Sequence, residues 1–148
     1  MVEVLVAIHN VLRWVVLMAA FAAIAGAWQG VISKRAWTKG DRLRSVVLVA
    51  SLHTQLLLGL VLYGLSPVVR SGFADMATAM GERSIRFFVV EHIFLMIVAV
   101  VVVQVGSIMA KKADNDAAKH KRSAIFFTVG LLLILGAIPW FRPLFPGL

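Results

Sequence analysis

The chain has 148 residues, of which 61% are hydrophobic, and its mean hydropathy is +0.92. Globular domains are about 45–50% apolar, so the composition excludes a mainly soluble protein, and the length allows one domain. The lack of cysteine excludes disulfides, thiolate metal sites, iron–sulfur clusters and covalently attached c-type haem. The net charge of +8 does not indicate nucleic-acid binding, because most of the excess lies in two short connections between apolar blocks.

Four apolar blocks follow one another along the chain. They cover about residues 4–32, 45–65, 85–110 and 123–141. Each is near or above the roughly 20 residues that an α-helix needs to cross a hydrocarbon core. The first block begins with Glu3 and has no positive region before it, so we interpret it as a retained span and not as a signal peptide. Short connections then predict an all-α, integral membrane four-helix bundle with up-down-up-down order.

Basic residues are unequally distributed over the connections. Ten lysines and arginines lie in the first and third connections, and four lie in the second connection and the C-terminal tail. The positive-inside rule therefore predicts that the first and third connections face the cytoplasm and that both termini lie outside. In the second connection Phe73, Met76 and Met80 have helical spacing, which fits either a short helix along the outer surface or an ordered loop.

Three of the four histidines lie inside the predicted spans. At a rise of about 1.5 Å per residue, His9 and His92 lie about 7 and 10 Å from the outer edges of their spans, and His53 lies about 18 Å deep. Ionisable residues at such depth are rare and indicate a functional site. The fourth histidine, His120, lies in a basic cluster at residues 119–122. We expect it to be solvated at the cytoplasmic end and exclude it from the site.

Imidazoles on facing helices are suited to holding a haem iron between them. His9 and His92 match best in depth, and His53 with His92 is a second pair. The histidine left over would serve a second haem, a quinone or a proton path. Two other interpretations stay open: the histidines hold the helices together by hydrogen bonds, or they form a proton or ion path. Against the path, no span is broken by Pro or Gly near its middle.

Arg13 lies one helical turn after His9, so the two side chains project from the same face. A guanidinium in the membrane needs a partner. Two partners fit: an ion pair with Glu91, at comparable depth in the third span, or a haem propionate. Glu91 and His92 are adjacent and point about 100° apart around a helix. If His92 faces the cofactor, Glu91 therefore faces a neighbouring helix.

Five short motifs span nearly the whole chain. They are His9-Asn10-Val11-Leu12-Arg13-Trp14, His53-Thr54-Gln55-Leu56-Leu57-Leu58-Gly59, Glu91-His92, Lys119-His120-Lys121-Arg122 and Ile138-Pro139-Trp140. Their order and spacing resemble a family of small four-helix bacterial membrane proteins labelled cytochrome b-like. The resemblance implies b-type haem binding in the bacterial cytoplasmic membrane and electron transfer linked to quinone. Larger membrane cytochromes b present two matched histidine pairs, whereas this chain has three histidines in its spans.

We therefore expect a haem b protein in electron transfer, as a subunit of a respiratory or photosynthetic complex. The expected cofactor-binding residues are His9, His53, His92 and Arg13, with the three histidines as candidate iron ligands. The expected partners are membrane lipid, other membrane subunits or a second copy of the chain, and quinone. The alternative is a cofactor-free structural or assembly subunit of a membrane complex. Nothing in the sequence supports an independent enzyme activity.

Overall fold

A computed structural model describes residues 1–142, which form helices and short connections without a strand. Four helical segments are long and apolar enough to cross a membrane. They are α1 (Val2–Ser33), α2 (Lys39–Leu65), the segment Arg83–Lys111, and α7 (Asp116–Ala137). The third segment consists of α5 (Arg83–Arg86), the π-helical turn η1 (Phe87–Glu91) and α6 (His92–Lys111). The prediction of an all-helical chain with four candidate spans is confirmed.

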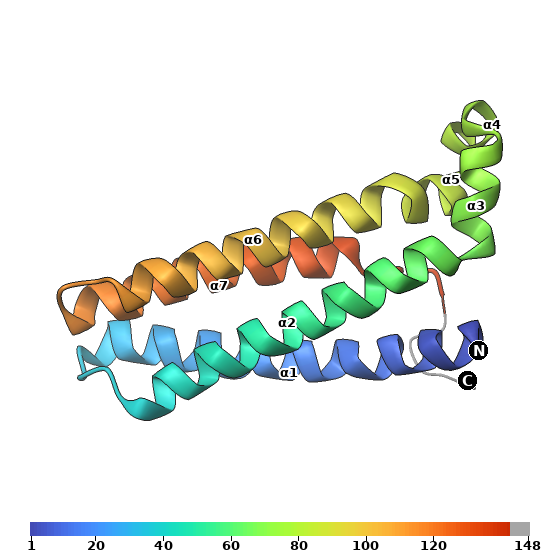
Figure 1. The fold of residues 1–148 in the computed structure, drawn as a ribbon. Helices are drawn as coiled ribbons and strands as arrows, with labels where there is room; N and C mark the ends of the chain where they lie inside the picture. Colours follow the sequence, from blue (N-terminus) through green and yellow to red (C-terminus); the bar gives the residue numbers. More distant parts are fainter. Residues whose placement is uncertain (143–148) are drawn as a thin grey trace.

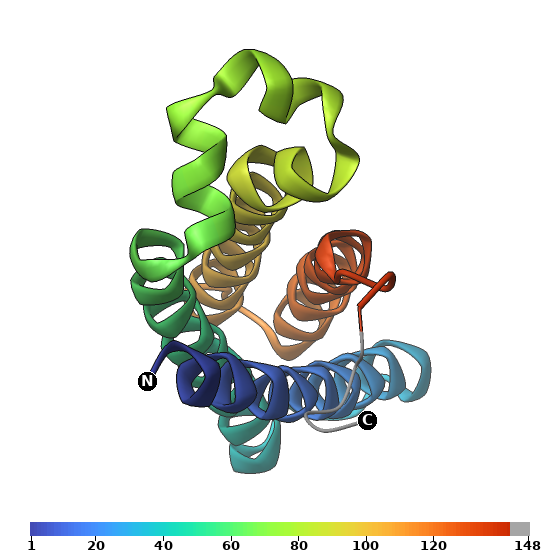
Figure 2. The same cartoon turned by 90° about the vertical axis from the view of Figure 1, so that its right-hand side faces the viewer.

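The four long helices lie side by side, and their ends gather in two groups (Figure 1). The connections at residues 34–38 and 112–115 lie together at what we call the connection end. The N-terminus, the two short helices α3 (Pro67–Ala74) and α4 (Met76–Gly81), and the end of the described chain lie at the opposite end, the lid end. Seen from the lid end, α3 and α4 stand beside the ends of α2 and α6 (Figure 2).

Each long helix packs against two others. The contacts close a ring in the order α1, α2, α6, α7, and they are most extensive between α6 and α7 and least extensive between α2 and α6. The core contains side chains from all four helices: Val16, Leu17, Ala20, Leu48, Leu52, Ala99, Val103, Phe127 and Leu131. Large apolar side chains such as Phe21, Phe94 and Leu132 are exposed on the outside. This arrangement suits a bundle surrounded by hydrocarbon.

The connection end is fixed by a buried carboxylate. Asp41 forms a capping box with Thr38 at the start of α2 and receives hydrogen bonds of 2.6 and 2.7 Å from the guanidinium of Arg35. Arg44 adds a third contact at 3.2 Å, and Arg35 also donates to the carbonyl of Gly26 in α1. The hydrogen bonds to Asp41 raise the pKa of Arg35 above its usual value. Together these bonds tie the first connection to both of its helices.

The second connection is helical, which selects one of the two alternatives that the sequence left open. Ser66 caps α3 and Pro67 occupies its first turn. Asp75 caps α4, and the hydrogen bonds from the hydroxyl and backbone N–H of Thr78 lower the pKa of Asp75. Phe73 is exposed on this surface. The connection therefore consists of two short capped helices.

The turn η1 joins the lid end to α6. Its backbone is wider than an α-helix, because the N–H of His92 donates to the carbonyl of Phe87, five residues earlier. A neighbouring carbonyl, that of Val89, accepts a 2.7 Å hydrogen bond from the hydroxyl of Tyr63 in α2. Turns of this kind occur frequently at functional sites. Here the residue directly after the turn is His92, one of the three candidate ligands predicted from the sequence.

Candidate functional site

The structure brings His9 and His92 together. Their ring centres are 6.4 Å apart, with an angle of 70° between the ring planes. His9 comes from the first third of α1 and His92 from the first residue of α6, so two different candidate spans supply the pair. Their proximity agrees with the similar depths that the sequence predicts for these two histidines within their spans. Their proximity makes the lid half of the bundle the candidate site.

The ring of His92 is oriented from α7. Its Nδ1 lies 2.7 Å from the carbonyl oxygen of Ala137, and because a carbonyl only accepts, Nδ1 carries the hydrogen. The other ring nitrogen, Nε2, is then left with a free lone pair. Metal-binding histidines are commonly oriented by this type of hydrogen bond. The rings of Phe87 and Phe88 also pack near His92, with ring centres 5.8 and 6.1 Å from that of the imidazole.

His9 is held differently. Its Nδ1 is buried and has no hydrogen-bond partner in the described part of the chain, although Gln55 donates a 3.0 Å hydrogen bond to the backbone carbonyl of His9. Gly59 lies beside the ring: a methyl group added there would come to 3.3 Å from Cε1 of His9. A buried ring nitrogen without a partner is costly and points to a missing ligand. Gly59 therefore lets α2 come close to this imidazole.

A cavity of about 440 Å³ opens beside the two histidines. Its walls come mainly from α1, α2 and α6, and they are largely apolar. Its size lies in the range of typical ligand sites, about 300–1,000 Å³. The polar residues that line it are His9, Asn10, Arg13, Gln55, Tyr63, Ser66, His92 and Arg142.

Among residues 1–142, two arginines line this cavity. Arg13 is buried, with its guanidinium 5.5 Å from the ring centre of Trp14, and the guanidinium of Arg142 lies 4.3 Å from the ring of Phe88. No carboxylate lines the cavity within residues 1–142. Two guanidinium groups beside two imidazoles suit a mainly apolar ligand that carries negative groups at one edge.

Glu91 has a partner on its own helix. Nε of Arg86 donates a 2.8 Å hydrogen bond to the carboxylate of Glu91. The sequence predicts Arg13 or a neighbouring helix as the partner of Glu91, whereas the structure pairs it with Arg86, five residues earlier. The wider turn of η1 lies between the two residues. The ion pair between Arg13 and Glu91 stays a prediction.

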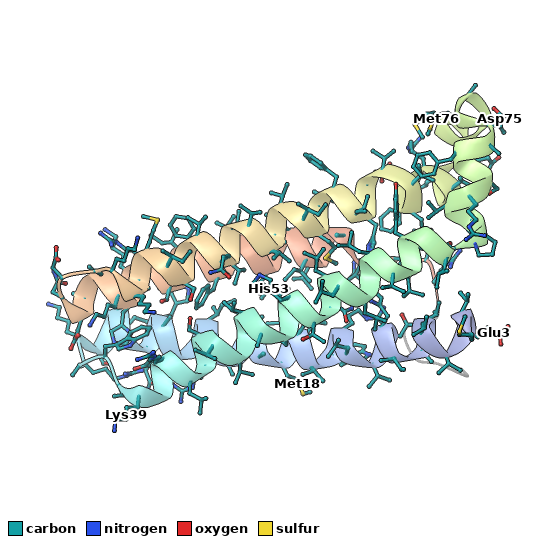
Figure 3. All side chains as sticks on the ribbon, in the orientation of Figure 1. Glu3, Met18, Lys39, His53, Asp75 and Met76 are labelled. Atoms are coloured by element: carbon teal, nitrogen blue, oxygen red, sulfur yellow. The ribbon has the colours of Figure 1, made fainter. Side chains whose placement is uncertain are left out.

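His53 is not brought to the site. It lies on the exposed surface of α2, near the middle of the bundle (Figure 3), and its Nδ1 is 2.8 Å from the carbonyl oxygen of Val49, one turn earlier. Its own helix thus supplies the partner of one ring nitrogen. Of the three candidate ligands, His9 and His92 share a site and His53 is separate.

His120 corrects the expectation of a solvated cytoplasmic residue. It is completely buried, contacts Gly30 of α1, and packs on Trp37 with the two ring centres 4.9 Å apart. Neither of its ring nitrogens has a hydrogen-bond partner in residues 1–142. The position was readable from periodicity, because His120 lies three and seven residues before Ser123 and Phe127, which share the buried face of α7. The basic neighbours of His120 obscured this spacing.

A haem fits the donor set of this site. His9 and His92, from two different candidate spans with ring centres 6.4 Å apart, would be the two residues to hold a haem iron. Among residues 1–142 no group of three or more His, Cys, Asp or Glu side chains could hold a metal ion. A haem needs only two protein ligands, because the porphyrin supplies the remaining four. Comparisons with protein-family models, curated proteins and solved structures found no match.

Proposed function

We propose that this chain is a b-type haem protein of the bacterial cytoplasmic membrane that takes part in electron transfer. The observation that supports the proposal most directly is the pair His9 and His92, from two candidate spans, beside a largely apolar cavity that two arginines line. The proposal includes an up-down-up-down bundle with both termini outside, so that the basic connection end faces the cytoplasm.

In this proposal each residue of the site has a separate task. His9 and His92 hold the iron, and the carbonyl of Ala137 orients His92 through its hydrogen bond. Arg13 and Arg142 neutralise the propionates, and the apolar walls exclude water. The bound haem supplies one-electron chemistry. The long helices leave little surface for a soluble donor, so we propose quinone or another membrane subunit as the redox partner.

A cofactor-free structural subunit is the second candidate. It is favoured by the hydrogen bond between His92 and Ala137, which joins two spans without any ligand. The two candidates differ in the fate of His9, whose buried Nδ1 has no such bond in the described chain. Haem binding gives that histidine a role, and a purely structural function does not.

The test is the haem content of the purified full chain. Protein from haem-replete cells is measured by its dithionite-reduced absorption spectrum and its haem-to-protein ratio. We expect His9→Ala and His92→Ala to lose the haem. His53→Ala and His120→Ala are matched controls that keep it, provided that circular dichroism shows unchanged helix content. A colourless wild-type protein, or full haem retention by His92→Ala, contradicts the proposal.

A further inference from the structure

A second cavity, of about 400 Å³, lies between α2 and α6 at the connection end. It lies far along the bundle from the histidine pair and shares no residue with the first cavity. Three of its lining residues are basic and come from three helices: Arg42 from α2, Lys111 from α6 and Lys119 from α7. This convergence is not explained by haem binding.

The positive charge of this cavity is poorly compensated. The side chains of Arg42 and Lys111 have no hydrogen bond or ion pair within the described chain, and Lys119 lies 3.6 Å from Asp116. No carboxylate lines the cavity itself, as far as the structure describes the chain. Like charges from separate helices repel one another unless an anion lies between them. The cavity therefore suits an anionic group.

Neutral hydrogen-bonding groups also line the cavity. The hydroxyl groups of Ser45 and Ser107 lie 3.1 Å apart and join α2 to α6. Gln104 also lines the cavity, and Trp37 borders it with its ring against His120. Hydroxyl and amide groups beside cations are the donors that bind phosphate oxygens.

The surface next to the cavity is apolar. Val46 lines it from α2 and is 52% exposed, and Ile108 lines it from α6 and is 41% exposed. These side chains continue into the lipid-facing sides of the two helices, where packing between α2 and α6 is least extensive. A ligand at this place meets positive charge at the end of the bundle and hydrocarbon along its side. That combination matches an amphiphile with an anionic headgroup.

We propose that this cavity binds the phosphate headgroup of an anionic phospholipid, with the acyl chains along α2 and α6. Arg42 and Lys111 bind the phosphate, and Ser45, Ser107 and Gln104 bind its oxygens or the glycerol. Basic pockets between spans on the cytoplasmic side are suited to such headgroups. A free phosphate shares the headgroup chemistry, but it gains nothing from the exposed apolar side chains beside the cavity.

The experiment is native mass spectrometry of the delipidated full chain in detergent. The probes are dioleoylphosphatidylglycerol, dioleoylphosphatidylcholine and inorganic phosphate. We expect the wild type to bind the anionic lipid about tenfold or more tightly than the zwitterionic one, because each cation near a headgroup contributes roughly a fivefold gain. The double variant Arg42→Gln with Lys111→Gln loses this preference.

The matched control is Lys112→Gln with Lys121→Gln. These residues are exposed at the same end, carry the same charge and do not line the cavity. The control keeps the lipid preference, and circular dichroism checks the helix content of both double variants. Equal loss in both variants would show a diffuse charge effect and overturn the proposal. Inorganic phosphate competing as well as the lipid would also overturn it, since the acyl chains would then contribute nothing.

Discussion

The burial of His120 against α1 gives a sharp prediction for Gly30. A methyl group added at Gly30 would overlap the Nδ1, Cε1 and Cγ atoms of the His120 ring. The ring is completely buried, so it has no open space to move into. Gly30→Ala should therefore destabilise the protein, although alanine is the better helix former.

The expected magnitude follows from two opposing effects. Overpacking a well-packed interior costs about 1–3 kcal/mol, and the overlap with three ring atoms points to the upper end of that range. Replacing glycine by alanine in a helix returns about 1 kcal/mol. We expect a net loss of about 2 kcal/mol in the free energy of unfolding. At Gly64, where an added methyl group meets no atom within 4 Å, the same substitution is neutral or stabilising.

The assay is unfolding in mixed micelles with increasing denaturing detergent, followed by circular dichroism. Wild type, Gly30→Ala, Gly64→Ala, His120→Ala and the Gly30→Ala, His120→Ala double variant are compared. Because His120→Ala removes the overlapping ring, the double variant should recover most of the loss caused by Gly30→Ala, with a coupling energy of about 2 kcal/mol. If Gly30→Ala is as stable as Gly64→Ala, His120 does not pack against Gly30 and the reasoning is refuted.

Three further predictions concern other parts of the structure. Gly59→Leu places a side chain against the ring of His9, which would have to move, and should lose most of the bound haem of the proposed site; Gly64→Leu should keep it in the same absorption assay. Asp41→Asn removes the carboxylate that pairs with Arg35 and Arg44, and should lower the free energy of unfolding in detergent by about 2 kcal/mol. Asp114→Asn, at an exposed position, should leave this free energy almost unchanged. Because the pKa of Asp75 is lowered, its cap on α4 should persist at neutral pH and weaken only below the ordinary pKa of aspartate, about 3.9. Amide protection factors of residues 76–81, corrected for the intrinsic pH dependence of exchange, measure this loss, and Asp75→Ala should remove it.

Hydropathy was sufficient to predict the four candidate spans. The apolar blocks are long and clearly separated, and helices are the only open structures that satisfy the backbone in hydrocarbon. The same reasoning gave depth, and depth selected His9 and His92 as the matching pair. Their ring separation of 6.4 Å is the consequence of that shared level.

Rotation about each helix axis was harder to predict than depth. His53 is deep enough for a ligand but projects from the exposed side of α2, and hydropathy does not distinguish the two sides when both are apolar. Glu91 pairs with Arg86 across a π-helical turn, whose spacing differs from that of an α-helix. His120 shares the helical spacing of the buried residues Ser123 and Phe127, but its basic sequence neighbours favour an exposed position.

The turn η1 lies between the short helices of the lid end and His92, and it holds one extra residue. A π turn contains one residue more than the α turn it replaces, so deleting a single residue from Phe87–Glu91 would restore a continuous α-helix. Because the wider turn already accommodates its extra residue locally, the segment before the deletion would keep its orientation relative to His92. The short helices α3 and α4 would keep their place beside α2, and the change would be confined to η1, which includes the carbonyl of Val89 that accepts from Tyr63. One extra residue is thus accommodated before α6 without displacing α3, whose residues Val68 and Val69 line the cavity beside His9 and His92.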